Sequence, residues 1–271
     1  MSSNQEQIEY WNERAGETWA ELQDRLDALL APLSAAGLAA ANVRSGERVL
    51  DVGCGCGDTS IALNSLGANV LGVDVSGPML ARARSRDASI EYHQADAATT
   101  DFDYEFDLVF SRFGVMFFDD PRAAFKNLCS ALKPGGRLLF VCWQPPAVNP
   151  WMATAGRAIA PYLPPSDEAP DPRAPGPFAF ADAHYVEQIL QDAGFSNIQI
   201  KAHGASLKVA DTLAEAVQFQ SRVGPAARVM SELEGDQRAQ ALAAVEEALR
   251  PFDEGSGLHL DSTVWLVSAK T

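Results

Sequence analysis

The stretch Val49-Leu50-Asp51-Val52-Gly53-Cys54-Gly55-Cys56-Gly57-Asp58-Thr59 decides the fold of this chain. It opens with an apolar run typical of a buried strand, passes through three glycines at alternate positions and ends at a predicted helix start. Glycine is needed where a backbone turns sharply or must approach a ligand without an intervening Cβ atom. A loop that leads into a helix also presents free N–H groups and a positive dipole end of about half a charge. The stretch therefore predicts a strand, a ligand-binding turn and a helix.

Further apolar runs that suit short strands alternate with helical patterns along the chain. The runs cover residues 70–73, 90–92, 108–110, 138–143 and 264–269. Helix starts are predicted at Ser76, Asp120 and Asp182, because each supplies a side-chain oxygen that can cap a first turn. Gly194 follows the last of these helices as its predicted C-terminal cap. Strands that alternate with helices predict an α/β fold with a mainly parallel sheet.

Three segments do not follow this alternation. The first, up to about residue 41, is predicted to be helical, with an apolar stripe made of Leu26, Leu29, Leu30 and Leu33. The second, residues 144–180, holds ten of the 16 prolines and suggests a long loop of the kind that forms lids or binding sites. The third, residues 211–257, is predicted to form helices.

Composition narrows the possible functions. The net charge of −15 and the pI near 4.6 argue against nucleic-acid binding, which needs a basic surface. The first residues show no leader pattern and no run is apolar enough for a membrane span, so we expect a cytoplasmic protein without membrane contact. The four cysteines, at positions 54, 56, 129 and 142, have no zinc-site spacing. We therefore expect reduced thiols and no metal.

The glycine pattern distinguishes two classes of nucleotide-like cofactor. A dinucleotide-binding loop has the pattern G-x-G-x-x-G, which here would require glycine at position 58, where the chain has Asp58. Asp51, two positions before the first glycine, also disfavours that class. The pattern D-x-G-x-G-x-G instead resembles motif I of the class I S-adenosylmethionine-dependent methyltransferases. The resemblance implies that the turn binds a methionine moiety rather than a pyrophosphate.

Residues after the other strands extend the resemblance over the whole chain. Asp74 ends the second strand, where the family uses a carboxylate to accept hydrogen bonds from both ribose hydroxyls. Asp96 follows the third strand, and the family's aspartate there accepts from the adenine amino group while the next N–H meets the ring. Residues 111–118 and 133–137 also resemble family signatures, and Tyr10-Trp11-Asn12, Ala15-Gly16 and Trp19 are similar to the N-terminal lid of one bacterial subgroup.

The resemblance implies a set of cofactor-binding residues and a complete topology. The set is Tyr10, Trp19, Asp51, Gly53, Cys54, Gly55, Thr59, Asp74, Val75, Met79, Asp96, Ala97, Ser111, Arg112 and Met116. The sheet is expected to have seven strands in the order 3-2-1-4-5-7-6, with strand seven antiparallel. A single domain 1–271 would contain a helical lid (1–45), a cofactor-binding core (46–143), cap insertions (144–180 and 204–258) and a last strand (259–271).

Several residues keep a structural alternative. Asp51 could satisfy N–H groups of its loop, Asp74 and Asp96 could be ordinary strand-end acids, and Arg112 could grip the methionine carboxylate or hold the fold together. Cys54 and Cys56 are expected to be small fillers of a tight turn. Phe113, Phe117, Phe118, Trp143 and Trp151 are either core or pocket wall. His203 and His259 are weak candidates for a catalytic base, because they are expected to flank the ligand-binding edge of the sheet.

The expected activity is transfer of a methyl group from S-adenosylmethionine to a small-molecule acceptor, with release of S-adenosylhomocysteine. A base is needed only if the acceptor arrives protonated, so the pattern leaves O-, N-, C- and S-methylation open. The cap insertions are expected to roof a closed cavity of roughly 300–1,000 Å³. A methyltransferase acting on protein or tRNA, and an enzyme that uses the cofactor without methylation, are the alternatives. We expect a monomer or homodimer.

Overall fold

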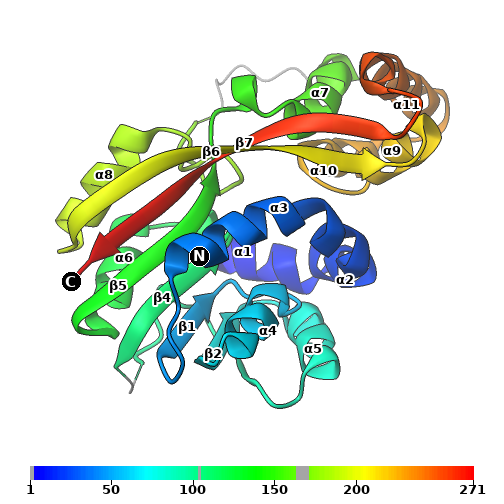
Figure 1. The fold of residues 1–271 in the computed structure, drawn as a ribbon. Coiled ribbons are helices and arrows are strands. Elements are labelled where there is room, and N and C mark those ends of the chain that lie inside the picture. The colour runs from blue at the N-terminus through cyan, green and yellow to red at the C-terminus, as the bar shows by residue number, and fades with distance from the viewer. Residues whose placement is uncertain (1–2, 103–104, 163–170) are drawn as a thin grey trace. The chain divides into compact units, whose positions relative to one another are not determined.

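The computed structural model describes residues 3–102, 105–162 and 171–271 and contains a seven-stranded sheet (Figure 1). The strand order is β3-β2-β1-β4-β5-β7-β6, as predicted. The strands are β1 (Arg48–Val52), β2 (Asn69–Asp74), β3 (Glu91–Gln94), β4 (Phe106–Arg112), β5 (Leu132–Trp143), β6 (Ser196–Ala210) and β7 (Leu258–Lys270). Strands β1 to β5 pair in parallel, and β7 pairs antiparallel with β5, so the predicted direction of the seventh strand is confirmed.

Of the helices that connect these strands, α5, α6 and α8 begin at the predicted capping residues. The helices are α4 (Asp58–Ser65), α5 (Gly77–Arg86), η1 (Val115–Phe117), α6 (Pro121–Ser130) and α8 (Ala183–Asp192). The side chains of Ser76, Asp120 and Asp182 accept hydrogen bonds from backbone N–H groups of the first turns of α5, α6 and α8. Gly194 has φ +95° just beyond α8, a conformation that favours glycine.

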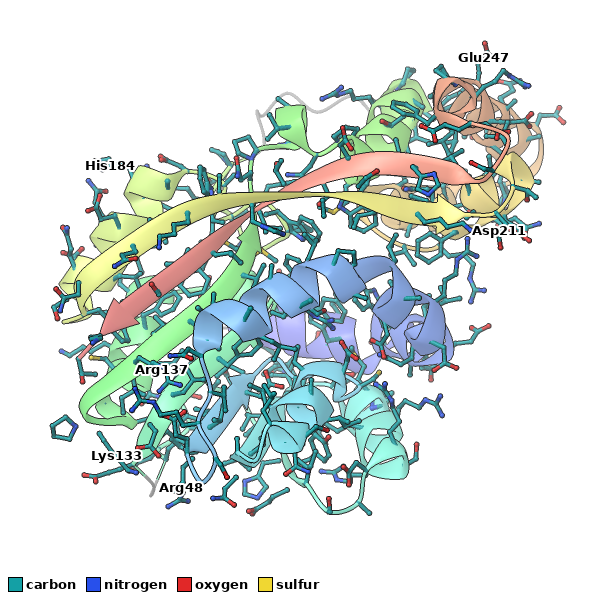
Figure 2. All side chains as sticks on the ribbon, in the orientation of Figure 1. Arg48, Lys133, Arg137, His184, Asp211 and Glu247 are labelled. Carbon is teal, nitrogen blue, oxygen red and sulfur yellow. The ribbon has the colours of Figure 1, made fainter. Side chains whose placement is uncertain are left out.

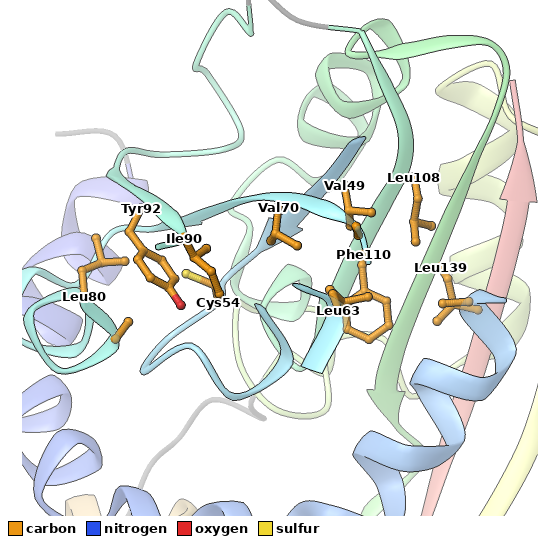
Figure 3. Packing of buried hydrophobic residues seen from close by; sticks show 13 residues of the cluster. Val49, Cys54, Leu63, Val70, Leu80, Ile90, Tyr92, Leu108, Phe110 and Leu139 are labelled. Carbon is orange, nitrogen blue, oxygen red and sulfur yellow. The ribbon is translucent and has the colours of Figure 1, made fainter. Parts of the chain in front are cut away.

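The core lies on a face of the sheet where side chains from neighbouring strands meet those of the flanking helices (Figure 3). Val49, Val70, Leu108 and Leu139 come from β1, β2, β4 and β5, and Leu63 comes from α4. All five side chains are buried. Burial of such a side chain contributes about 1.5–3 kcal/mol, so this cluster stabilises the packing of α4 on the central strands of the sheet.

The residues before β1 form three helices, as expected for this segment. They are α1 (Ser3–Asn12), α2 (Arg14–Glu21) and α3 (Gln23–Ala41). The predicted stripe of four leucines is buried along α3. No helix among the described residues combines the length and the apolar character that a membrane crossing requires.

The chain divides into two compact units. The first comprises Met1–Gln144, Pro172–His203 and Val264–Thr271, and the second comprises Pro145–Asp171 and Gly204–Thr263. The second unit contains η2 (Pro146–Val148), α7 (Pro150–Ile159), η3 (Ala160–Tyr162), α9 (Leu213–Gln220), α10 (Pro225–Glu232), α11 (Gly235–Leu249) and η4 (Arg250–Phe252). The division into one domain with cap insertions stays a prediction.

Two expectations about the extent of elements were wrong. The stretch 144–180 contains helix α7, because Pro150 occupies a first-turn position where a missing N–H costs nothing; residues 163–170 of this stretch lie outside the described residues. Strand β6 continues to Ala210 instead of ending near His203, since buried Leu207 and Val209 alternate with exposed residues at the period of a strand. Strand β7 begins at Leu258, close to its expected start at residue 259.

Candidate cofactor site

The glycine turn after β1 has a backbone that other residues could not adopt without strain. Gly53, Gly55 and Gly57 have φ values of +66°, +55° and +83°. A Cβ atom on Gly53 would lie 2.7 Å from Cα of Gly114, the residue that follows the end of β4 by two positions. The turn therefore packs backbone against backbone on the neighbouring loop. Gly114 was not among the predicted site residues, although a glycine beyond the end of a central strand is the signal that could have indicated it.

Asp74 lies at the end of β2, beside the glycine turn. Its Oδ2 accepts a hydrogen bond from the N–H of Gly55 at 2.8 Å, and its Oδ1 accepts one from the N–H of Ser76 at 2.8 Å. Burial raises the pKa of this carboxyl group, and the N–H donors partly oppose that rise. Each carboxylate oxygen can accept a second hydrogen bond, so Asp74 has acceptor capacity for ligand hydroxyls. Its assignment to the ribose stays a prediction.

Asp51 is completely buried at the end of β1. Its Oδ2 accepts hydrogen bonds from the hydroxyls of Thr59 at 2.7 Å and Ser60 at 2.6 Å, both in the first turns of α4. Its Oδ1 has no hydrogen-bond partner among the described residues. Burial raises the pKa of Asp51 to about 6, and the two hydroxyls counteract part of that effect. The recorded partners are hydroxyls rather than loop N–H groups, and Ser60 is a contact that the sequence did not indicate.

Arg112, at the end of β4, holds two helices in place. Its Nη1 donates to Oδ2 of Asp58 at 2.8 Å and to Oγ of Ser34 at 2.5 Å. Asp58 is the first residue of α4, and Ser34 belongs to the N-terminal helix α3. Of the two roles considered for Arg112, these contacts favour the structural one.

A second arginine ties the same N-terminal helix to the glycine turn itself. Arg86, in α5, donates to the carbonyl of Cys56 at 2.9 Å and forms an ion pair with Asp27 of α3 at 2.7 Å. Burial is the largest influence on Asp27 and raises its pKa. Helix α3 is thus anchored on the glycine turn through charged, half-buried contacts.

The loop after β3 is shaped by Asp96 and held by a residue from α6. Oδ1 of Asp96 accepts from the N–H of Ala98 at 2.9 Å. Asn127 Nδ2 donates to the carbonyls of Ala97 at 3.0 Å and Thr100 at 2.8 Å. Asp96 and Ala97 therefore follow β3 as predicted, while Asn127 was missed because its contact depends on how α6 packs.

The segment after β4 combines strain with aromatic stacking. Phe113 has φ +63°, a conformation that costs about 1–3 kcal/mol in a residue with a side chain. Its ring stacks on Trp143, at the end of β5, with 4.0 Å between ring centroids and 2° between planes. Ser111 is buried and accepts a hydrogen bond from the N–H of Gly114 at 3.3 Å. Met116 is buried in η1.

The N-terminal aromatic residues pack on one another and on Phe117 within the first unit. Trp11 contacts Tyr10, Trp19 and Phe117 edge to face, with centroid distances of 5.3, 5.8 and 5.3 Å. Tyr10 is 49% exposed. Trp11, which was not among the predicted site residues, is the ring that contacts the other three. Val75 directly precedes Ser76, the capping residue of α5, and Met79 lies in the first turn of that helix. The carbonyl of Val75 accepts from the side chain of Asn12 at 2.8 Å.

The cysteines of the glycine turn have the environment of structural residues. Cys54 and Cys56 are buried and not in disulfides. Burial raises the pKa of Cys54 well above the ordinary thiol value and that of Cys56 to about 12, so neither forms a thiolate near neutral pH. Among the described residues no group of three acidic, cysteine or histidine side chains could hold a metal ion.

Both histidine candidates lie within strands. His203 lies in the middle of β6, so its expected position at a strand end was wrong. His259 lies at the beginning of β7 in the second unit, with Nδ1 3.8 Å from an oxygen of Glu254. A catalytic role for either residue stays a prediction.

Basic residues gather at the opposite end of the first unit's strands, where Arg48, Lys133 and Arg137 lie together (Figure 2). Lys133 pairs with Asp107 at 2.8 Å, and Arg137 pairs with Glu47 at 2.7 Å. These ion pairs neutralise much of the local positive charge, so the cluster is not a free basic surface for nucleic acid.

Residues 50–140 match the family model described as "Methyltransferase domain". An uncharacterized protein of Mycobacterium tuberculosis is 38% identical over 120 residues, which make up 42% of this chain and 44% of that protein. Phosphoethanolamine N-methyltransferase 1 of Triticum aestivum is 29% identical over 190 residues, 67% of this chain and 32% of that enzyme. The chain therefore spans less than half the length of either relative.

Solved structures share the topology along most of the chain. The YcgJ protein of Bacillus subtilis superposes with a TM-score of 0.58 and 18% identity, covering 88% of this chain and 97% of that one. A putative methyltransferase from Bacillus halodurans has a TM-score of 0.57, 18% identity and the same coverage. The strand order, the glycine turn and the match over residues 50–140 agree: these residues form a methyltransferase domain, and the chain has the Rossmann-like fold of the class I S-adenosylmethionine-dependent methyltransferases.

Proposed function

We propose that this chain binds S-adenosylmethionine and transfers its methyl group to a small-molecule acceptor, releasing S-adenosylhomocysteine. The observation that carries the proposal is the meeting of the glycine turn with two carboxylates at the carboxyl ends of β1 and β2, the buried Asp51 and the partly buried Asp74. In open α/β sheets, ligands bind outside the carboxyl ends of the strands, at the point where strand order reverses. Strands β1 and β4 flank that point here.

The donors and acceptors of the site match the polar groups of this cofactor. Asp74 is held by two backbone N–H groups in an orientation from which it can accept from the ribose hydroxyls. Asp51 keeps one buried oxygen without a partner, and an ammonium group such as that of the methionine moiety would satisfy it. Asp96 is the proposed acceptor for the adenine amino group. The glycines allow the ligand to approach the backbone, because no Cβ atoms stand in the way.

When bound, the cofactor supplies an activated methyl group on its sulfonium sulfur. The chain's own residues then contribute mainly orientation and exclusion of water. Phe113 and Trp143 provide a stacked aromatic surface after β4 and β5, which suits the apolar wall of a small-molecule site. A base is required only for an acceptor that arrives protonated, and His203 and His259 remain the candidates.

Two observations support a small-molecule acceptor over a nucleic acid. The net charge of −15 opposes binding of polyanions, and the basic cluster around Arg137 is neutralised by ion pairs. The plant relative is a phosphoethanolamine methyltransferase by name, which makes small polar amines a reasonable first class of acceptor to test. We propose a cytoplasmic monomer or homodimer.

Ligand-induced thermal stabilisation tests the cofactor directly. S-adenosylhomocysteine at about 100 times its Kd should stabilise the folded chain by about 2.7 kcal/mol, while NAD and NADP should have no effect. Stabilisation by NAD alone would refute the proposal.

Mass spectrometry of metabolite extracts incubated with the chain and isotopically labelled S-adenosylmethionine tests the transfer. Methyl transfer predicts S-adenosylhomocysteine together with an acceptor that has gained one labelled methyl group. Labelled protein or tRNA would instead identify a macromolecular acceptor, and cofactor binding without labelled product from any extract would identify a non-methylating enzyme.

A further inference from the structure

Asn12, the last residue of helix α1, makes every hydrogen bond that its side chain allows. Its Nδ2 donates to the carbonyls of Ile8 and Val75, both at 2.8 Å. Its Oδ1 accepts from the N–H of Gly77 at 2.9 Å and from Nε2 of Gln94 at 3.1 Å. An asparagine amide has two donors and two acceptor positions, so this side chain is fully used. Three of the four bonds connect the N-terminal helix to residues far along the chain.

Two of the four hydrogen-bond partners of Asn12, Val75 and Gly77, belong to the turn that carries Asp74. Val75 and Gly77 flank Ser76, whose N–H donates to Oδ1 of Asp74 at 2.8 Å. The hydroxyl of the same serine donates to the carbonyl of Trp11 at 2.7 Å. Ser76 is completely buried, so breaking these bonds would leave polar groups unpaired. One short turn therefore holds both the carboxylate and the end of the N-terminal helix.

Gly16, in helix α2, shows how closely this contact is built. A Cβ atom at this position would lie 2.1 Å from the carbonyl oxygen of Trp11 and 2.5 Å from Oγ of Ser76. Glycine inside a helix costs about 0.5–1 kcal/mol relative to alanine, so its presence needs a packing reason. The reason here is the room required by the bond between Ser76 and Trp11.

Helix α1 also contacts a second loop, through the aromatic ring of Trp11. The Trp11 ring packs against Phe117 of η1, which follows β4, and against Trp19 of α2. In the sheet, β1 lies between β2 and β4, so the glycine turn lies between the two loops that the N-terminal helices contact. Docking of these helices thus fixes the loops on both sides of the turn.

We propose that Asn12 is a positioning residue that latches the N-terminal helices onto the turn after β2 and thereby couples their docking to the geometry of Asp74. The docking itself stands on the contacts alone, whereas its effect on the cofactor rests on the function proposed above. Because coupling between two equilibria is reciprocal, a bound cofactor should stabilise the docked helices by the same factor by which docking raises cofactor affinity.

The decisive variant is Asn12→Asp, which keeps the size of the side chain and replaces its donor with a second oxygen. That oxygen would face the carbonyls of Ile8 and Val75, so the latch should open. Asn12→Ala removes the same bonds without adding charge and serves if the first variant does not fold. Gln5→Ala is the matched control, because Gln5 lies on the same helix and its recorded hydrogen bond goes only to the exposed Glu9.

Hydrogen exchange of the ligand-free chain tests the latch first. Amides of residues 5–21 should exchange at least tenfold faster in Asn12→Asp than in the wild type, while Gln5→Ala leaves them unchanged and α8 serves as an internal reference. Unchanged exchange in both Asn12 variants would overturn the proposal, whatever the chain binds.

Calorimetry with S-adenosylhomocysteine tests the coupling. The Asn12 variants should bind at least tenfold more weakly than the wild type and Gln5→Ala, and the ligand should slow wild-type exchange in residues 5–21 by a similar factor. Faster exchange with unchanged affinity would refute the coupling. If the wild type itself fails to bind this ligand, the proposed function fails, while the exchange experiment still decides on the latch.

Discussion

The cofactor site in the first unit and the second unit use buried polar side chains for different purposes. In the second unit, buried Asn149 exchanges hydrogen bonds with the backbone of Thr263, and buried Gln220 donates to the carbonyl of Trp151 at 2.6 Å. In the first unit, Asp51 is equally buried, yet its Oδ1 has no hydrogen-bond partner in the part of the chain that the structure describes. Among the described residues of the second unit, Oγ of Ser262 and Nδ1 of His259 also have no hydrogen-bond partner, but neither group is a carboxylate, which costs more to desolvate than a neutral hydroxyl.

We propose that this difference separates side chains that hold the chain together from side chains that bind a ligand. A polar group that satisfies backbone atoms stabilises the fold whether or not a ligand is present. A buried carboxylate with a vacant acceptor position destabilises the free protein and is retained where a ligand supplies the missing donor. Four substitutions test this comparison, and the first has the largest expected effect.

Gly53→Ala should disrupt the glycine turn. The added Cβ would lie 2.7 Å from Cα of Gly114, and the left-handed backbone adds strain, so we expect a loss of about 2–5 kcal/mol of unfolding free energy. Urea denaturation measures the loss. Gly46→Ala is the control, since its φ is +84° but no atom lies within 4 Å of the added Cβ. Equal losses in the two variants would contradict the tight packing of Gly53 on Gly114.

Asp51→Asn should change the pH dependence of stability. Asp51 ionises near pH 6 in the folded chain and near 3.8 in the unfolded chain, so the folded state binds more protons between these values. The stabilisation from neutral Asp51 is complete below pH 3.8 and is lost as pH rises through 6, which amounts to about 3 kcal/mol. Relative to the variant, the wild type should lose this amount between pH 4 and 7 in urea denaturation. Parallel pH profiles would show that Asp51 carries no buried charge.

Asp74→Asn should weaken cofactor binding while the fold persists. Charge-assisted hydrogen bonds contribute about 1.5–3 kcal/mol, so the Kd for S-adenosylhomocysteine should rise at least tenfold in calorimetry. Asp261→Asn, at an exposed position in the second unit, should leave the Kd unchanged. Equal affinity in Asp74→Asn and the wild type would remove Asp74 from the ribose site.

Gly156→Ala, in helix α7 of the second unit, should have the smallest effect. No atom lies within 4 Å of the added Cβ, and alanine inside a helix is favoured over glycine, so stability should rise by about 0.5–1 kcal/mol. The Kd for S-adenosylhomocysteine should not change. A lower affinity in this variant would mean that the second unit takes part in cofactor binding.

Much of the fold could be predicted because its signals are local. The capping oxygens of Ser76, Asp120 and Asp182 act within one helical turn, and all three helices begin where they were expected. Helix α7 was missed because prolines that suggest a loop are also compatible with a first helical turn. The extent of β6 was missed because its period-two alternation of buried and exposed residues is visible in the sequence only over a few positions.

The candidate site was predicted less completely, since several of its contacts join distant parts of the chain. Asn127 lies in no motif, whereas Gly114 and Asn12 lie in stretches that resemble family signatures, yet each of the three matters through a partner on another element. For Arg112, the residue was predicted but its role could not be decided from the sequence. Its position after β4 allowed either a ligand contact or a structural one, and only packing brings Asp58 and Ser34 within hydrogen-bond distance.

The sequence by itself determined the α/β class, the glycine turn and the carboxylates at the ends of β1 and β2, because hydrophobic period, glycine spacing and strand-end position are local properties. The tertiary structure decided which of those groups are already satisfied. Asp51 and Asp74 are both acids beside the same turn, yet one is held by two N–H groups and the other keeps a vacant buried oxygen. That distinction depends on the packing of α4 and of the turn after β2, and on the N-terminal helix that Asn12 fastens to that turn.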